Sequence, residues 1–114
     1  MAYLKDFYGQ IVFKIENDYI KDFYGTIKYK IDNNRVKDFY GKVLYVIEND
    51  YIKDFYGRTQ LVVRNNRICD FYGRTIATFD SQNFKEFSGM IKYKIDGSLT
   101  RREILALIAV IYIL

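Results

Sequence analysis

Apolar and polar residues alternate in short runs along residues 1–97, and a continuous apolar run follows. Residues 26–31 (Thr-Ile-Lys-Tyr-Lys-Ile) and 90–95 (Met-Ile-Lys-Tyr-Lys-Ile) place an apolar side chain at every second position. This period of two is typical of a β-strand with one buried face. Shorter runs at 35–37, 51–53 and 67–69 centre on one apolar residue and predict a second, shorter strand.

The alternation belongs to a repeat. Asp-Phe-Tyr-Gly occurs at 6–9, 22–25, 38–41, 54–57 and 70–73, with a degraded copy at 86–89, so the period is sixteen residues. We number six units from 1–16 to 81–96, each with one short and one long strand. Asn-Asp or Asn-Asn pairs between units fit tight hairpin turns, which need positive φ. Asp first and Gly fourth in the tetrapeptide fit a type I turn with a glycine bulge, so we interpret both as turn residues.

Two topologies fit such a repeat. A parallel solenoid would stack identical charges about 4.8 Å apart, whereas an antiparallel meander separates them to about 9.6 Å, so we expect the meander. The chain begins with a short strand (3–5) and its repeats end with a long one (91–95). We expect these two strands to pair and to close the sheet, which removes both edges.

A closed sheet of twelve strands has room for a helix. At a tilt near 40° its backbone diameter is roughly 23 Å, which leaves a bore of roughly 10–12 Å, the width of one α-helix. Residues 104–114 are apolar on every face, and Thr100 with Glu103 forms the pattern of a capping box. Eleven residues are too few to cross a bilayer, which takes about 20. We therefore predict no transmembrane segment and a helix that fills the barrel.

The predicted fold is thus all-β with one C-terminal helix. It is a closed 12-stranded antiparallel meander barrel of six 16-residue hairpin repeats around a central apolar helix. We expect a single domain, 1–114, with the repeats in 1–97 and the core helix in 98–114. Alternate residues of each long strand, such as Ile27, Tyr29 and Ile31, should face the bore. Because Thr59, Thr75 and Ala77 are small, the helix should lie nearest the fourth and fifth units.

The phrase 36–41 (Val-Lys-Asp-Phe-Tyr-Gly), followed by an alternating strand, and the apolar run 104–114 resemble the tubby C-terminal domain superfamily. That superfamily includes the phospholipid scramblases and the LURP-one-related proteins. The resemblance covers the whole chain at the level of architecture. It implies a helix-filled barrel, with phosphoinositide binding as in tubby proteins or a lipid-related role as in scramblases. No motif transfers residue by residue, and the acidic calcium cluster and the cysteine-rich segment of scramblases have no counterpart here.

The composition argues against catalysis. There is no His among the 114 residues, one Cys, no glycine-rich phosphate loop and no nucleophile motif. We therefore predict a protein that is not an enzyme, with no catalytic residues, no metal and no cofactor. Cys69 stands where other units have Lys and is interpreted as drift, with a reactive thiol beside Arg67 as the alternative. A charged N-terminus and a single cysteine favour a cytoplasmic location.

The outward positions supply the binding hypotheses. Units one, two and six carry lysines there, whereas units three to five carry apolar residues, and this difference predicts an interface. The expected function is self-association or protein binding through Leu44, Val46, Val62 and Ile76. The alternative is binding of anionic phospholipid head groups or other phosphates at Lys42, Arg58 and Arg74, since arginine suits phosphate. Nucleic-acid binding ranks last, because the net charge of +4 is modest and most tyrosines are placed inward or in turns.

Overall fold

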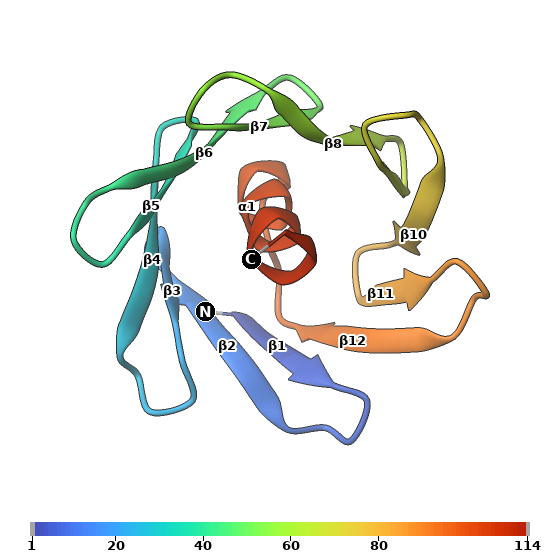
Figure 1. Cartoon of the computed structure of the whole chain (residues 1–114). Coiled ribbons are helices and arrows are strands. Elements are labelled where there is room, and N and C mark those ends of the chain that lie inside the picture. The colour runs from blue at the N-terminus through green and yellow to red at the C-terminus, as the bar shows by residue number, and fades with distance from the viewer. Residues whose placement is uncertain (1, 114) are drawn as a thin grey trace.

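The chain forms a closed barrel of twelve strands with one helix inside it, and the computed structural model describes residues 2–113 (Figure 1). The predicted fold class is confirmed. The elements are β1 (Ala2–Asp6), β2 (Ile11–Glu16), β3 (Tyr19–Lys21), β4 (Ile27–Asp32), β5 (Arg35–Asp38), β6 (Val43–Glu48), β7 (Tyr51–Asp54), β8 (Thr59–Arg64), β9 (Arg67–Cys69), β10 (Thr75–Phe79), β11 (Asn83–Glu86), β12 (Ile91–Asp96) and α1 (Arg101–Tyr112). Met1 and Leu114, the first and last residues of the predicted domain, lie outside the described residues.

The sheet is a meander in which each strand pairs antiparallel with its neighbours in sequence. Closure comes from β1 and β12, whose register pairs Tyr3 with Asp96 and Asp6 with Tyr93. The parallel solenoid is therefore excluded. The molecule is a flat disc with principal extents of 36 × 34 × 20 Å, and its short dimension is close to the rise of a twelve-residue helix, about 18 Å.

The alternation of strand direction places the two kinds of turn at opposite ends of the barrel. Turns between units lie at one end, and asparagines there take the positive φ that a tight hairpin needs, for example 54° at Asn33 and 53° at Asn49. The Asp-Phe-Tyr-Gly turns lie at the other end. In the third unit Gly41 has φ +85°, and its N–H donates to the carbonyl of Asp38 at 3.1 Å.

A β-bulge interrupts every unit and corrects one prediction. In the second unit Ile20 pairs with Tyr29, but Lys21 pairs with Ile27, so the register shifts between them. Equivalent shifts occur in the other five units. Directly paired residues share a face of the sheet, so Ile27 lies on the side of the outward Lys21 and is only half-buried. The prediction that Ile27 faces the bore is wrong, because a bulge breaks the period of two.

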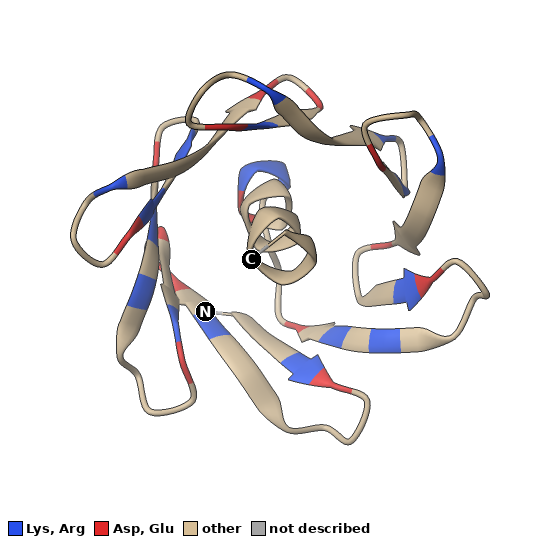
Figure 2. Ribbon diagram, in the orientation of Figure 1, with Lys and Arg blue, Asp and Glu red and all other residues tan. Residues whose placement is uncertain are grey.

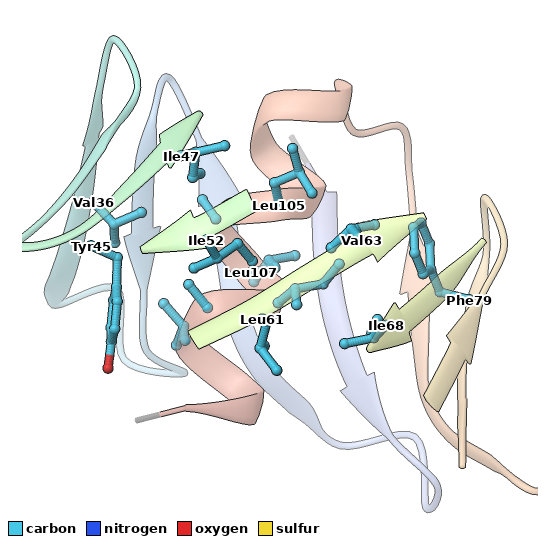
Figure 3. Close-up of a cluster of buried hydrophobic side chains, with 14 of the residues drawn as sticks. Val36, Tyr45, Ile47, Ile52, Leu61, Val63, Ile68, Phe79, Leu105 and Leu107 are labelled. Atoms are coloured by element: carbon cyan, nitrogen blue, oxygen red, sulfur yellow. The ribbon is translucent and has the colours of Figure 1, made fainter. Parts of the chain in front are cut away.

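The core combines the centres of the short strands with the helix (Figure 3). Six side chains of the short strands are fully buried: Leu4, Ile20, Val36, Ile52, Ile68 and Phe84. They surround the buried stretch of α1 from Leu105 to Val110. The close-up shows Leu105 and Leu107 directed toward side chains of β6, β7 and β8. A barrel filled in this way needs no other layer to cover its inner face.

The helix enters the barrel at the end that carries the asparagine turns. Thr100 and Glu103 form the predicted capping box, with the Glu103 N–H donating to Thr100 Oγ1 at 3.2 Å. Arg102 pairs with Asp18 at 3.0 Å and Arg101 with Asp50 at 3.3 Å, which ties the first turn to two hairpins. The helix therefore runs toward the Asp-Phe-Tyr-Gly end. In the described part of the chain, no helix has the length and hydropathy needed to span a bilayer.

The position of the helix within the bore differs from the prediction. Its backbone makes its most extensive approach to a single strand at β6 of the third unit, and not at a strand of the fourth or fifth unit. Ala77 does face the bore, since it pairs with the buried Ile68 and is 1% exposed. The bulge accounts for the other two small residues, because it pairs Thr75 with the outward Cys69 and Thr59 with the outward Lys53. Small residues at those positions make room on the outside of the wall, not inside it.

Candidate binding surfaces

One end of the barrel carries a ring of exposed aromatic side chains, which we call the aromatic rim. Each Asp-Phe-Tyr-Gly turn contributes a phenylalanine and a tyrosine, and the degraded turn contributes a phenylalanine with a methionine beside it. Its members are Phe7, Tyr8, Phe23, Tyr24, Phe39, Tyr40, Phe55, Tyr56, Phe71, Tyr72, Phe87 and Met90. The phenylalanines are 55–74% exposed and the tyrosines 79–90%. Exposed apolar groups gathered at one end make the rim a candidate interaction surface.

The aromatic pair in each of the first five turns is held in a fixed arrangement. The two rings meet edge to face, with centroids 5.3–5.6 Å apart. Below them the aspartate closes the turn: Asp38 Oδ1 accepts the backbone N–H groups of Tyr40 and Lys42, both at 2.9 Å. The carboxylate is therefore used inside the turn, as the sequence predicted, and the aromatic side chains point outward from a rigid base.

Two of the three predicted phosphate-binding residues are already paired at the rim. Arg58 Nε donates to Asp54 Oδ2 at 2.9 Å, and the guanidinium lies 5.5 Å from the centre of the Tyr56 ring. Arg74 repeats this arrangement one unit later with Asp70, also at 2.9 Å. Both arginine side chains nevertheless stay about three-quarters exposed, at 73% and 76%. The Asp–Arg pair thus holds each guanidinium against a tyrosine and leaves its terminal nitrogens in solvent.

The same contacts set the acidity of the two aspartates. Partial burial works against ionisation of Asp54, but the N–H groups of Arg58 and Tyr56 and the guanidinium of Arg58 outweigh it and lower the pKa of Asp54. The pKa of Asp70 is lowered in the same way by Arg74. Both carboxylates are therefore charged at neutral pH and offset the charge of their arginines.

Lys42 occupies the matching position in the third unit. No carboxylate forms an ion pair with Lys42 within residues 2–113. A hollow of about 250 Å³ between β6 and β7 brings Lys42 together with Arg58 and Leu44. The predicted set is therefore only partly assembled, since Lys42 and Arg58 share this hollow and Arg74 lies one unit further around the ring.

The predicted apolar outer face is largely covered. Leu44 and Val46 are half-buried and Ile76 is 38% exposed, but Val62 is only 7% exposed. Val62 faces outward, yet its cross-strand neighbours Tyr51 and Cys69 flank it on both sides. Figure 2 shows the contrast that motivated the prediction, with blue bands on β4 and β12 and an almost uncharged β10. These four residues do not form a continuous exposed patch, and their role stays a prediction.

An ion pair joins consecutive units on the outer face at five of the six junctions. The last residue of one long strand is acidic and pairs with the lysine of the next short strand; in the fifth unit the acid, Asp80, directly follows the strand. The pairs are Glu16–Lys21, Asp32–Lys37, Glu48–Lys53, Asp80–Lys85 and, across the closure, Asp96–Lys5, at 2.7–3.9 Å. The hydrogen bond from Lys37, together with its charge, lowers the pKa of Asp32. At the sixth junction Arg64 and Cys69 replace both members.

Two further groups, the Cys69 thiol and the Tyr112 hydroxyl, are buried. The Cys69 side chain is 4% exposed, with Sγ 3.9 Å from Thr75 Oγ1, so the thiol is covered and not presented to solvent. At the rim end of α1 the Tyr112 hydroxyl is buried without a hydrogen-bond partner among the described residues. Burial raises the pKa of Tyr112 to about 12.

The sequence predicted the turns correctly, but not the exposed aromatic side chains that they carry. The Asp and Gly of Asp-Phe-Tyr-Gly explain the backbone of the turn, and its interpretation as turn chemistry rests on these two residues alone. The signal lay in the two residues between them. The central positions of a turn at a barrel end face away from the sheet, so aromatic residues repeated there predict exposed rings.

The fold and these surfaces define a class of protein, a six-unit meander barrel filled by its own C-terminal helix, with an aromatic rim at one end. This architecture is consistent with that of tubby-like proteins. Comparison with family models, with curated protein sequences and with solved structures finds no significant match to the chain.

Proposed function

We propose that the chain is a non-catalytic binding module that attaches to a lipid–water interface through its aromatic rim. The observation that carries this proposal is the set of six exposed phenylalanines at one end of a rigid barrel, one at each turn. Attachment to lipid also agrees with the lipid-related roles that the resemblance to tubby and scramblase proteins implies. It differs from the expected protein–protein interface on the outer wall, where Val62 is buried.

The shape of the rim favours lipid over a protein partner. In Figure 1 the Asp-Phe-Tyr-Gly loops splay away from the central helix as separate tips around a ring. The exposed aromatic residues belong to these loops, so each tip carries its own. A fluid interface can surround separate tips, whereas a protein surface would need a matching hollow for each. Aromatic side chains are favoured at the boundary between acyl chains and head groups, with the tyrosine hydroxyl on the polar side.

The energy available is sufficient for reversible attachment. Transfer of a fully exposed phenylalanine side chain out of water contributes about 1.5–3 kcal/mol, so a shallow insertion contributes on the order of 1 kcal/mol per tip. Six tips on one rigid body act together, because the first contact brings the others to the surface. The sum, on the order of 6 kcal/mol before the cost of orienting the protein, supports attachment without a membrane-spanning segment.

The basic residues at the rim would add a preference for anionic lipid. Lys42, Arg58 and Arg74 each follow the turn glycine directly and therefore lie at the level of the aromatic side chains. When the tips insert, their charged groups come to head-group depth. We infer that they strengthen binding to anionic lipid without being needed for attachment itself, because Arg58 and Arg74 are partly neutralised by their aspartates.

Vesicle co-sedimentation tests the proposal. Wild type should sediment with phosphatidylcholine vesicles, and more strongly when phosphatidylserine is included. Phe39→Ser/Phe55→Ser should weaken both by about tenfold or more, since about 2 kcal/mol of apolar transfer is removed. Tyr51→Ser is the matched control, because it removes an exposed aromatic side chain beside an asparagine turn, at the end of the barrel opposite the rim. Lys42→Gln/Arg58→Gln should remove only the increment due to phosphatidylserine.

Three results would contradict the proposal. They are a wild type that stays in solution with both vesicles, equal losses for the rim variant and Tyr51→Ser, and undiminished binding by a rim variant that is folded. Light scattering tests whether the rim instead binds a second copy of the chain. A wild-type dimer that Phe39→Ser/Phe55→Ser dissociates would show that it does. A dimer dissociated by Leu44→Lys instead would favour the outer wall.

A further inference from the structure

The junction between the fourth and fifth units departs from the other five in both members of the ion pair. Where the others have a carboxylate, this junction has Arg64, and where they have a lysine it has Cys69. Loss of one member would leave the other charge unpaired, but here the acid has become a base and the lysine a neutral residue. Within one chain of repeated units, five junctions thus serve as controls for the sixth.

The change places two arginines side by side. Arg64 and Arg67 are direct cross-strand partners at the end of β8 and the start of β9. Like charges in directly opposed positions destabilise a sheet. At the equivalent place in the second and third units, Arg35 faces the acidic Asp32. No ion pair with Arg64 or Arg67 forms within the described residues, so their charges are not neutralised by the protein.

The same change opens a hollow on the outer wall. A lysine at position 69 would extend along the wall toward its acid, as Lys37 does toward Asp32 at 2.7 Å. Cysteine is shorter, and a hollow of about 540 Å³ lies at this position over β8, β9 and β10. Its lining residues are Arg64, Asn65, Asn66, Arg67, Cys69, Gly73, Thr75 and Thr78. They include two guanidinium groups, two amides and two hydroxyls, and no carboxylate.

We propose that this hollow, the Arg64–Arg67 groove, binds a phosphate group. Guanidinium groups bind phosphate oxygens in pairs of hydrogen bonds, and hydroxyl and amide donors complete such sites. A bound anion would also remove the repulsion between the two arginines. The volume lies within the roughly 300–1,000 Å³ typical of small-molecule sites, so it accommodates a phosphate monoester together with part of the molecule that carries it. Cys69 lines the groove, where its short side chain leaves space for the ligand, and does not itself bind the phosphate.

The groove is separate from the aromatic rim and from the phosphate-binding set that the sequence predicted. Arg58 and Arg74 hold carboxylates at 2.9 Å, whereas Arg64 and Arg67 do not. The groove lies on the outer wall and includes none of the aromatic side chains of the rim. The inference therefore does not depend on the proposed membrane attachment, and each can fail alone.

The test rebuilds the missing ion pair. Arg64→Glu/Cys69→Lys restores the arrangement of the other five junctions and should raise the melting temperature while abolishing phosphate binding. Binding of inorganic phosphate is measured by calorimetry and by amide chemical shifts, with chloride at equal ionic strength as the reference. Arg64→Gln/Arg67→Gln should weaken binding by about tenfold for each arginine. Arg35→Gln is the matched control and should bind phosphate as wild type does.

Two probes distinguish a soluble phosphate ligand from a phosphate carried by a lipid. Inorganic phosphate in solution reports a soluble ligand, and phosphatidic acid in phosphatidylcholine vesicles reports a phosphate monoester on a lipid. Loss of either response in the rebuilt variant, with Arg35→Gln unaffected, supports the groove. The inference is wrong if wild type and the rebuilt variant respond equally to both probes, or if wild type responds to neither. Phe39→Ser/Phe55→Ser should leave phosphate binding unchanged, which separates this result from failure of the rim.

Discussion

The turn aspartate is the residue whose removal should show best how the rim is supported. Asp38 Oδ1 accepts two backbone N–H groups, from Tyr40 and Lys42, both at 2.9 Å. Two backbone bonds also close the turn: the Gly41 N–H donates to the Asp38 carbonyl, and the Asp38 N–H donates to the Lys42 carbonyl. Asp38→Ala removes only the carboxylate contacts, so its effect isolates what the side chain adds.

The magnitude follows from these two contacts. A hydrogen bond to a charged group contributes about 1.5–3 kcal/mol when water is excluded, but this turn is exposed and water replaces part of the loss. About 1 kcal/mol for each bond gives a destabilisation of about 2 kcal/mol. For a domain of this size the melting temperature should fall by about 8 °C. Asp38→Asn keeps an oxygen acceptor and should lose less than half of that.

Urea unfolding of wild type and the two variants measures the effect, with Asp6→Ala as a replicate in another unit. Asp6 makes the same two contacts, to Tyr8 and Gln10, also at 2.9 Å. Because the two turns do not share partners, the losses should add in the double variant. A loss below about 0.5 kcal/mol for Asp38→Ala would refute the reasoning, as would equal losses for Ala and Asn.

Three other predictions concern the core and the charges. Leu107→Ala empties a fully buried position of the helix and should cost about 3 kcal/mol in urea unfolding; a loss under about 1 kcal/mol would mean that the helix is not part of the cooperative core. Tyr112→Phe removes a buried hydroxyl without a partner and should stabilise by about 1 kcal/mol, so a lower melting temperature would contradict the structure. Lys37 lowers the folded pKa of Asp32, so this contribution is present above the unfolded pKa of about 4 and is lost as the pH falls through the lower folded value. Asp32→Asn should therefore flatten the acid limb of the stability profile, and an unchanged limb would count against the pair.

The repeat made most of the fold predictable. Sixteen residues that recur with turn residues at fixed places define both strands and both turns, and the capping box at Thr100 defines the start of the helix. Closure followed from a chain that begins with a short strand and ends with a long one. These features depend on local chemistry, which a single sequence displays directly.

The surfaces were less predictable, because they depend on geometry that alternation does not encode. A bulge moves Ile27 to the outer side and, in the fifth unit, Thr75, so inward and outward assignments fail at the first position of each long strand. Val62 is outward but covered by its neighbours, which depends on the size of side chains on other strands. The Arg64–Arg67 groove became visible only when register showed which residues form pairs across the junctions.

The pairing of β1 with β12 has a consequence for synthesis on the ribosome. The barrel cannot close until residue 96 has left the exit tunnel, and the helix that fills it follows later still. Until then the nascent chain holds two open strand edges and an interior without its apolar filling, both of which invite association with other chains. The interval between translation of the first and last strands is therefore the period in which a chaperone would protect this protein most.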